Sequence, residues 1–217
     1  KLLFFSPEIE FIRLFINQNL QQNPSDISEI SNQNDSPLLT FGRIWSAGKN
    51  QNSQFVIDNI PKLKSKVNGL KFCYLDYLSG ESKLNKLISP ENDLEIFLRL
   101  HQGPSFVKSA YRRLAWYRLI IEDTLGYIAY KNKILTEGSI YTDDDKQAFE
   151  EAQSNEIPNI SLLKARLLFD GGDYNRSLEE INECISSKMT LKMKVEYYYR
   201  KARCYQQLKQ FNESIRN

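Results

Sequence analysis

The sequence predicts an all-α protein and, more narrowly, an α-α superhelix built from helical hairpins. Two observations carry this prediction. A pattern occurs twice near the C-terminal end, where Ala165 and Ala202 lie 37 residues apart and so do Tyr174 and Phe211. No segment shows the alternation and β-branched clustering that are typical of a strand. Two landmarks that keep one spacing indicate a repeated supersecondary unit.

Each copy of the pattern predicts two short antiparallel helices. A small residue at Ala165 lets a second helix approach closely, and Gly172 can take the left-handed backbone that ends a helix. Asp173 can then cap the next helix, and Tyr174 can pack across the turn. One hairpin cannot bury both apolar stripes by itself, so we expect neighbouring hairpins to stack.

The pattern resembles the tetratricopeptide repeat (TPR), a unit of about 34 residues with a small residue in its first helix and Gly-x-Tyr at its turn. The matching residues are Ala165, Gly172, Tyr174 and the small Ser177 of the second helix. The second copy departs from the pattern, because Lys209 stands where the turn glycine would be. The resemblance implies a binding scaffold that uses the concave face of the superhelix.

Two stretches, residues 105–117 and 164–174, also resemble poorly characterised bacterial TPR-like proteins. That likeness brings no activity with it.

Carrying the repeat backwards places equivalent small residues at Ala115 and Gly80. Gly80 and Ala115 are 35 residues apart, whereas Ala115 and Ala165 are 50 apart. The excess predicts one extra helix around residues 142–157, capped by Thr142. We therefore expect about four irregular hairpins over residues 62–217, in an array truncated at its C-terminal end.

Residues 1–61 are expected to form an N-terminal helical extension with a degenerate hairpin. Ser6-Pro7 and Ser36-Pro37 are typical helix starts, and the helix that begins at Ser53 is expected to end at Pro61.

Composition excludes several classes of partner. The 29 basic and 27 acidic residues leave a net charge of +2, which favours neither nucleic acid nor an anionic membrane. The apolar run at residues 1–5 is too short to span a bilayer. We expect a soluble protein with no nucleic-acid partner and no membrane insertion, and the compartment stays open between cytoplasm and periplasm.

The sequence offers no catalytic, cofactor or metal site. His101 is the single histidine, and no nucleophile or orienting partner accompanies it. Three cysteines without a CxxC pair form neither a disulfide framework nor a zinc motif. The carboxylates of residues 143–145 point in different directions on a helix and suit its positive end. We expect a non-enzymatic protein without cofactors.

The candidate binding residues follow from the resemblance. In TPR proteins, first-helix residues at fixed offsets from the small residue line the concave groove, which here gives Tyr77, Arg112, Trp116, Arg166, Phe169, Tyr199 and Arg203. Arg166 and Arg203 share one offset in adjacent repeats, and two aligned guanidiniums would suit a carboxylate or an acidic peptide. The family's lysine and asparagine clamp for a C-terminal carboxylate is not found.

Other interpretations stay open. The arginines fit ion pairs with Glu196 or Asp170 equally well, and the aromatic residues fit plain packing. The alternative function is a structural or self-association module of a larger protein, acting through exposed ends of the repeat array.

Overall fold

The computed structural model describes residues 36–67, 72–154, 156–184 and 189–216. Within these ranges the chain forms helices and no strand, so the all-α class is confirmed. Its contacts divide it into two units, residues 1–71 and 72–217. The helix expected after Ser6-Pro7 lies outside the described residues.

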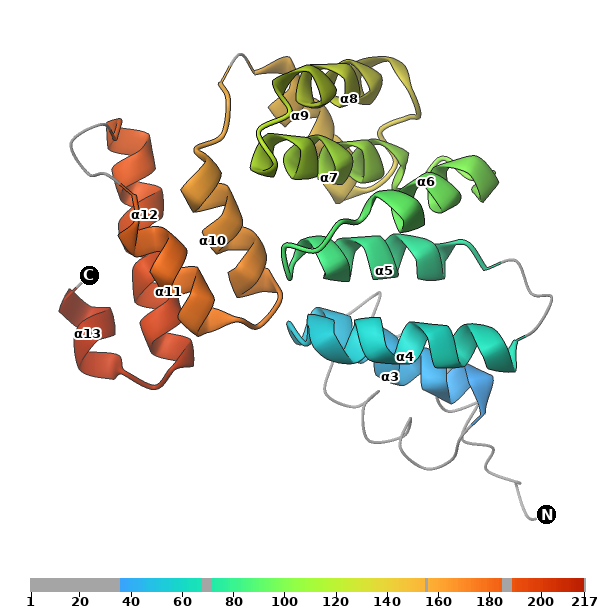
Figure 1. Ribbon diagram of the computed structural model, residues 1–217, viewed down its shortest axis with the longest axis horizontal. Coiled ribbons are helices and arrows are strands. Elements are labelled where there is room, and N and C mark those ends of the chain that lie inside the picture. Colours follow the sequence, from blue (N-terminus) through green and yellow to red (C-terminus); the bar gives the residue numbers. More distant parts are fainter. Residues whose placement is uncertain (1–35, 68–71, 155, 185–188, 217) are drawn as a thin grey trace, which may run out of the picture. The chain divides into compact units, whose positions relative to one another are not determined.

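Unit 1 contains one described hairpin, formed by α3 (Pro37–Lys49) and α4 (Ser53–Lys66) (Figure 1). The Ser-Pro helix start is confirmed, because the Ser36 hydroxyl accepts a hydrogen bond from the Leu39 N–H at 3.3 Å. The two helices pack through buried aliphatic side chains, namely Leu39, Ile44, Val56, Ile60 and Leu63.

The predicted helix end at Pro61 is wrong, because α4 runs through the proline to Lys66. A proline inside a helix costs about 3 kcal/mol in lost hydrogen bonding and ring contacts. Leu63, in the turn that contains the proline, is only 2% exposed. Burial of a leucine is worth about 1.5–3 kcal/mol, and Val67 still donates its N–H to the Leu63 carbonyl at 3.1 Å. Packing therefore offsets the local cost.

The described residues of unit 2 form four hairpins and one inserted helix (Figure 1). The hairpins are α5 (Tyr74–Leu84) with α6 (Glu91–Leu100), α7 (Val107–Ile120) with α8 (Thr124–Thr136), α10 (Ile160–Asp170) with α11 (Tyr174–Asn182), and α12 (Leu191–Gln207) with α13 (Phe211–Arg216). The inserted helix α9 (Asp143–Gln153) packs on α7 and α8. It accounts for the 50-residue spacing, and Thr142 caps it as expected.

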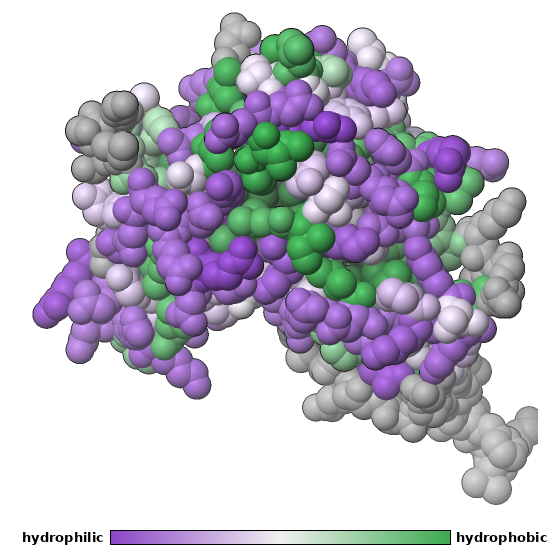
Figure 2. All heavy atoms as spheres, in the orientation of Figure 1, coloured by the Kyte–Doolittle hydropathy of each residue, from purple (hydrophilic) through white to green (hydrophobic). Residues whose placement is uncertain are grey.

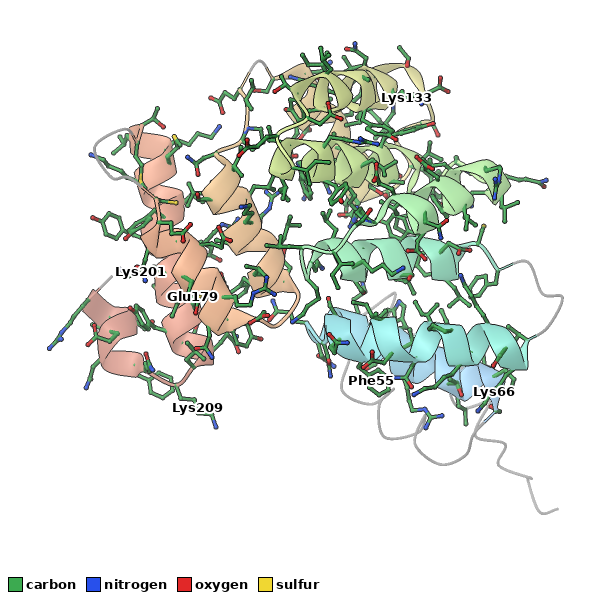
Figure 3. The ribbon with its side chains drawn as sticks, viewed as in Figure 1. Phe55, Lys66, Lys133, Glu179, Lys201 and Lys209 are labelled. Carbon is green, nitrogen blue, oxygen red and sulfur yellow. The ribbon has the colours of Figure 1, made fainter. Side chains whose placement is uncertain are left out.

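In each described hairpin of unit 2, a residue with left-handed backbone lies two or three positions after the last residue of the first helix. These residues are Leu87, Glu122, Gly172 and Lys209, each seven positions after the small residue of its helix. Figure 3 labels Lys209 at the turn between α12 and α13. The backbone therefore shows turns at the spacing that the small residues predict from the sequence.

The hydrogen bonds of these turns repeat as well. Gly172 donates its N–H to Phe169 at 3.0 Å, and Lys209 donates to Gln206 at 3.1 Å. The N–H of each following residue donates to a carbonyl five positions back, at 2.8 Å in both turns. This is the Schellman arrangement, which satisfies helix-terminal carbonyls. Lys209 adopts it despite having a Cβ.

A side-chain hydrogen bond ties the two helices together in both C-terminal hairpins. The Ser177 hydroxyl donates to the Ala165 carbonyl at 2.7 Å, and the Ser214 hydroxyl donates to the Ala202 carbonyl at 2.9 Å. Asp173, expected as a side-chain cap, makes no capping bond to α11. Its carboxylate instead accepts from the Lys86 ammonium at 2.9 Å and so links the ends of α10 and α5.

Candidate functional site

A cavity of about 870 Å³ lies within unit 2, lined by α7, α8 and α9 together with α10 and the start of α12. This volume falls within the range of about 300–1,000 Å³ that is typical of ligand pockets. The apolar lining includes Ala115, Trp116, Ile134, Ala148, Leu162 and Leu163. The charged lining comprises Arg112, Lys131, Arg166, Lys192, Glu150, Glu151, Glu156 and Glu196. In Figure 2, hydrophobic residues at this part of unit 2 are surrounded by hydrophilic ones.

The inserted helix α9 forms one wall and is fixed by a single buried carboxylate. Asp145 is 0% exposed and accepts from the backbone N–H of Phe106 at 2.9 Å and of Ser109 at 3.1 Å, at the start of α7. It also accepts from the N–H and hydroxyl of Thr142, which completes a capping box on α9. One side chain therefore caps two helices.

Two further carboxylates of α9 contact arginines of α7. Arg112 pairs with Glu151 at 3.3 Å and with Asp144 at 3.7 Å. Arg113 pairs with Asp144 at 3.4 Å and with Glu81 of α5. The acidic start of α9 thus has specific partners in the protein, beyond the dipole effect expected from the sequence.

Two guanidinium groups, those of Arg112 and Arg166, stack on the Trp116 ring. The central carbon of Arg112 lies 4.6 Å from the centroid of the Trp116 ring, and that of Arg166 lies 4.3 Å from it. Both distances fall within the range of cation–π attraction. Three of the residues predicted from the repeat therefore meet at the cavity.

The positive charge of Arg166 is only partly neutralised by nearby carboxylates. Among the described residues it makes no ion pair and no hydrogen bond; its contact is the stacking on Trp116. Burial and the nearby Arg200 lower the pKa of Arg166, although Glu151, Asp170 and Glu196 act in the opposite direction. Burial likewise lowers the pKa of Arg112, helped by the adjacent Arg113.

Arg113 stacks on an aromatic ring as Arg166 does, but nearby carboxylates neutralise its charge. Its guanidinium carbon lies 4.9 Å from the Tyr77 ring centroid. Burial lowers the pKa of Arg113, but Glu81, Tyr77 and Asp144 together raise it above its ordinary value. Arg113 is thus a compensated, structural cation.

The remaining candidates lie elsewhere in unit 2. Tyr77 is 1% exposed, and its hydroxyl shares a hydrogen bond with the Ser109 hydroxyl at 3.0 Å, so it belongs to the core. Phe169 is 7% exposed and packs with Ala165, Ile181 and Cys204.

Tyr199 is 57% exposed and accepts a hydrogen bond from Arg203 at 3.0 Å. The Arg203 guanidinium carbon lies 5.6 Å from the centroid of the Phe169 ring. Arg166 and Arg203, which share one offset in the repeat, therefore stack on different rings. Glu196 pairs with Arg200 at 2.8 Å, and no described ion pair joins it to Arg166 or Arg203.

The repeat offsets do not point to Arg113, Glu151 or the wall formed by α9 as parts of this region. The 50-residue spacing and the acidic run at residues 143–145 were the available signals. They locate an extra helix, but the surface on which that helix packs depends on contacts distant in sequence.

His101 ends α6, stacks on Phe97 at 4.6 Å between centroids, and places its Nδ1 3.6 Å from the Cys73 sulfur. Cys73, Cys184 and Cys204 are free thiols. The described residues contain no group of three or more metal-ligating side chains. In the same ranges, no helix has the length and apolar character to cross a bilayer.

Comparisons of the chain with protein-family models, with curated proteins and with solved structures found no match.

Proposed function

We propose that this protein is a non-enzymatic scaffold that binds a segment of another protein in the cavity between α7–α9 and α10–α12. The cavity itself carries the proposal, because it joins an apolar interior to a charged margin and contains Arg112, Trp116 and Arg166. Protein segments are commonly held by such combinations, in which apolar anchors give affinity and polar groups fix the orientation.

A TPR-like superhelix is the proposed architecture. An arginine of a first helix stacks on an aromatic ring of the preceding first helix at three junctions: Arg113 on Tyr77, Arg166 on Trp116, and Arg203 on Phe169. Such recurrence is expected when first helices form one continuous row, as in stacked-hairpin proteins.

Apolar side chains at the margin of the cavity supply the contacts to test. Ile157 is 62% exposed and Leu191 is 80% exposed, and both line the cavity. Their exposure means that polar substitutions leave the fold intact, since surface changes usually alter stability by less than about 0.5 kcal/mol. A bound segment would cover both residues.

A displayed library of random peptides, selected against the full chain, tests the proposal. We expect the enriched peptides to bind an Ile157→Ser, Leu191→Ser variant about tenfold more weakly, which corresponds to about 1.4 kcal/mol. The matched control is Ile140→Ser, Leu125→Ser, since these residues are 51% and 82% exposed and do not line the cavity. Failure to enrich any peptide, or equal binding to all three proteins, would overturn the proposal.

Self-association is a second candidate, favoured by the last hairpin. Cys204 is the one buried residue of α12, while Val195, Tyr198, Phe211 and Ile215 are at least half exposed. Ile215 lies 37 residues after Leu178, which packs against the hairpin core. A sedimentation coefficient that rises with concentration, and that stays constant in an Ile215→Asp variant, would support association of two copies through this hairpin. A concentration-independent monomer would exclude it.

A further inference from the structure

The basic residues of the cavity differ in how they are neutralised. Lys192 pairs with Glu156 at 2.5 Å, and Lys131 donates to the Ser154 carbonyl at 2.5 Å. Arg112 pairs with Glu151. Arg166 has no oxygen partner among the described residues, so it is the cation in this lining that is left for a ligand.

Arg112 is already engaged by the protein. Its side chain is 5% exposed, and its two terminal nitrogens face Glu151 and Asp144. Its Nε is buried and closed to a ligand. Arg166 is less buried than Arg112, so its guanidinium is the group that a ligand can contact.

Burial lowers the pKa of both arginines. Neighbouring guanidiniums add to this effect, chiefly Arg113 at Arg112 and Arg200 at Arg166. An anion that contacted Arg166 would offset the cost of burying its charge.

We propose that the cavity recognises a single carboxylate adjacent to an apolar side chain, with the Arg166 guanidinium as its donor. The inference rests on the proposed function and names the feature that a bound segment must carry. Guanidinium groups hold carboxylates through paired, charge-assisted hydrogen bonds. The apolar side chain packs on Ile157 and Leu191, the exposed apolar residues of the lining.

The remaining charges of the cavity favour a monoanion over a phosphate group. Glu150, Glu151 and Glu196 also line it. A phosphate, with a charge of about −2 at neutral pH, meets roughly twice the repulsion from these side chains that a carboxylate meets. The carboxylate can come from an Asp or Glu side chain or from the C-terminus of the segment.

The experiment uses peptides enriched on the full chain in the library selection, resynthesised with each carboxylate changed in turn. One arm replaces Asp by Asn or Glu by Gln, and the other replaces the C-terminal carboxylate by a carboxamide. We expect one of the two arms to weaken binding by about 10- to 100-fold, which identifies the source of the carboxylate.

Protein variants assign the effect to Arg166. Arg166→Gln should weaken binding of the carboxylate peptide by the same factor and leave the neutral peptide within about twofold, so the two changes are not additive. Arg166→Lys should give an intermediate loss, because it keeps the charge and loses the paired donors. Lys192→Gln removes one charge from the same cavity and should change binding by less than about threefold.

The outcomes separate this inference from the proposed function. Peptides that bind the cavity but tolerate both neutral replacements, or that bind Arg166→Gln as tightly as the parent, overturn the carboxylate site and leave the scaffold proposal standing. Equal losses in Lys192→Gln and Arg166→Gln also overturn it, because they indicate general electrostatic attraction. Absence of any peptide that depends on Ile157 and Leu191 overturns the scaffold proposal and, with it, the carboxylate site.

Discussion

Arg113 and Arg166 stack on aromatic rings in the same way, yet their ionic surroundings are opposite. Arg113 lies 4.9 Å from the Tyr77 ring centroid, pairs with Glu81 and Asp144, and is 7% exposed. Arg166 lies 4.3 Å from the Trp116 ring centroid and has no described ion pair. A buried cation with close ion pairs is part of the fold, whereas the half-buried Arg166, without an ion pair among the described residues, keeps a charge with which a ligand could pair.

The difference has a structural cause. Arg113 lies where α5, α7 and α9 meet, and two of these helices supply carboxylates to it. Arg166 lines the cavity together with residues of α9, where Glu151 is already paired with Arg112. The following substitutions test whether this distinction between a structural and a binding arginine holds.

The largest effect is expected for Arg113→Met. It removes a guanidinium that is 7% exposed and takes one partner from each of Glu81 and Asp144, and removing one member of a buried pair typically costs about 3 kcal/mol. Urea unfolding followed by circular dichroism measures the loss. The control is Arg176→Met, since Arg176 is 48% exposed and should contribute less than about 0.5 kcal/mol. Equal losses in both variants would contradict the comparison.

Asp145→Asn should cost about 2 kcal/mol, because an amide oxygen replaces a carboxylate that accepts four hydrogen bonds and caps two helices. Asp143→Asn, an exposed change in the same acidic run, should cost less than about 0.5 kcal/mol. Chemical denaturation of both variants provides the measurement. A similar stability of the two would show that α9 is not anchored through Asp145.

A paired surface charge gives an intermediate case. Lys86→Met removes the partner of Asp173, whose pKa is lowered because the hydrogen bond and charge of Lys86 outweigh burial. A lowered carboxyl pKa stabilises the fold above about pH 4, and the contribution disappears as the pH falls through the folded-state pKa. We expect Lys86→Met to cost about 1 kcal/mol at pH 7 and nothing near pH 2. A cost independent of pH would refute this.

The smallest effect on stability is expected for Arg166→Met. The variant loses a cation–π contact worth about 0.5–1 kcal/mol, but it also removes a charge that is only partly compensated, so the net change should stay within about 0.5 kcal/mol. Thermal and urea unfolding measure it, alongside Arg113→Met. A loss as large as that of Arg113→Met would make Arg166 a structural residue and weaken its assignment to ligand binding.

Much of the framework could be predicted from the sequence because it depends on local signals. The spacing of Gly80, Ala115, Ala165 and Ala202 located four turns, and the 50-residue interval located α9. Small residues and helix caps act on neighbouring backbone, so their effects can be inferred from position alone.

The site was less predictable because its geometry depends on distant contacts. Offsets transferred from a repeat family placed Tyr77 in a groove, but α7 covers its ring through Arg113 and Ser109. They also aligned Arg166 with Arg203, although each arginine stacks on its own ring. Periodicity gives the face of a helix that a residue occupies. Which other element covers that face is set by tertiary packing.

The residues of α9 contribute to the cavity wall but not to the turns of the hairpins. The turns of the hairpins are held by backbone geometry and by hydrogen bonds such as that of Ser177 to the Ala165 carbonyl, and none of these involves α9. The wall of the cavity, in contrast, takes Ala148, Glu150, Glu151 and Ala152 from α9, whereas Asp145 of the same helix caps α7. Glu150, which lines the cavity and has no ion pair to α7 among the described residues, is therefore a position where the cavity wall can be changed while Asp145 and the turns are kept.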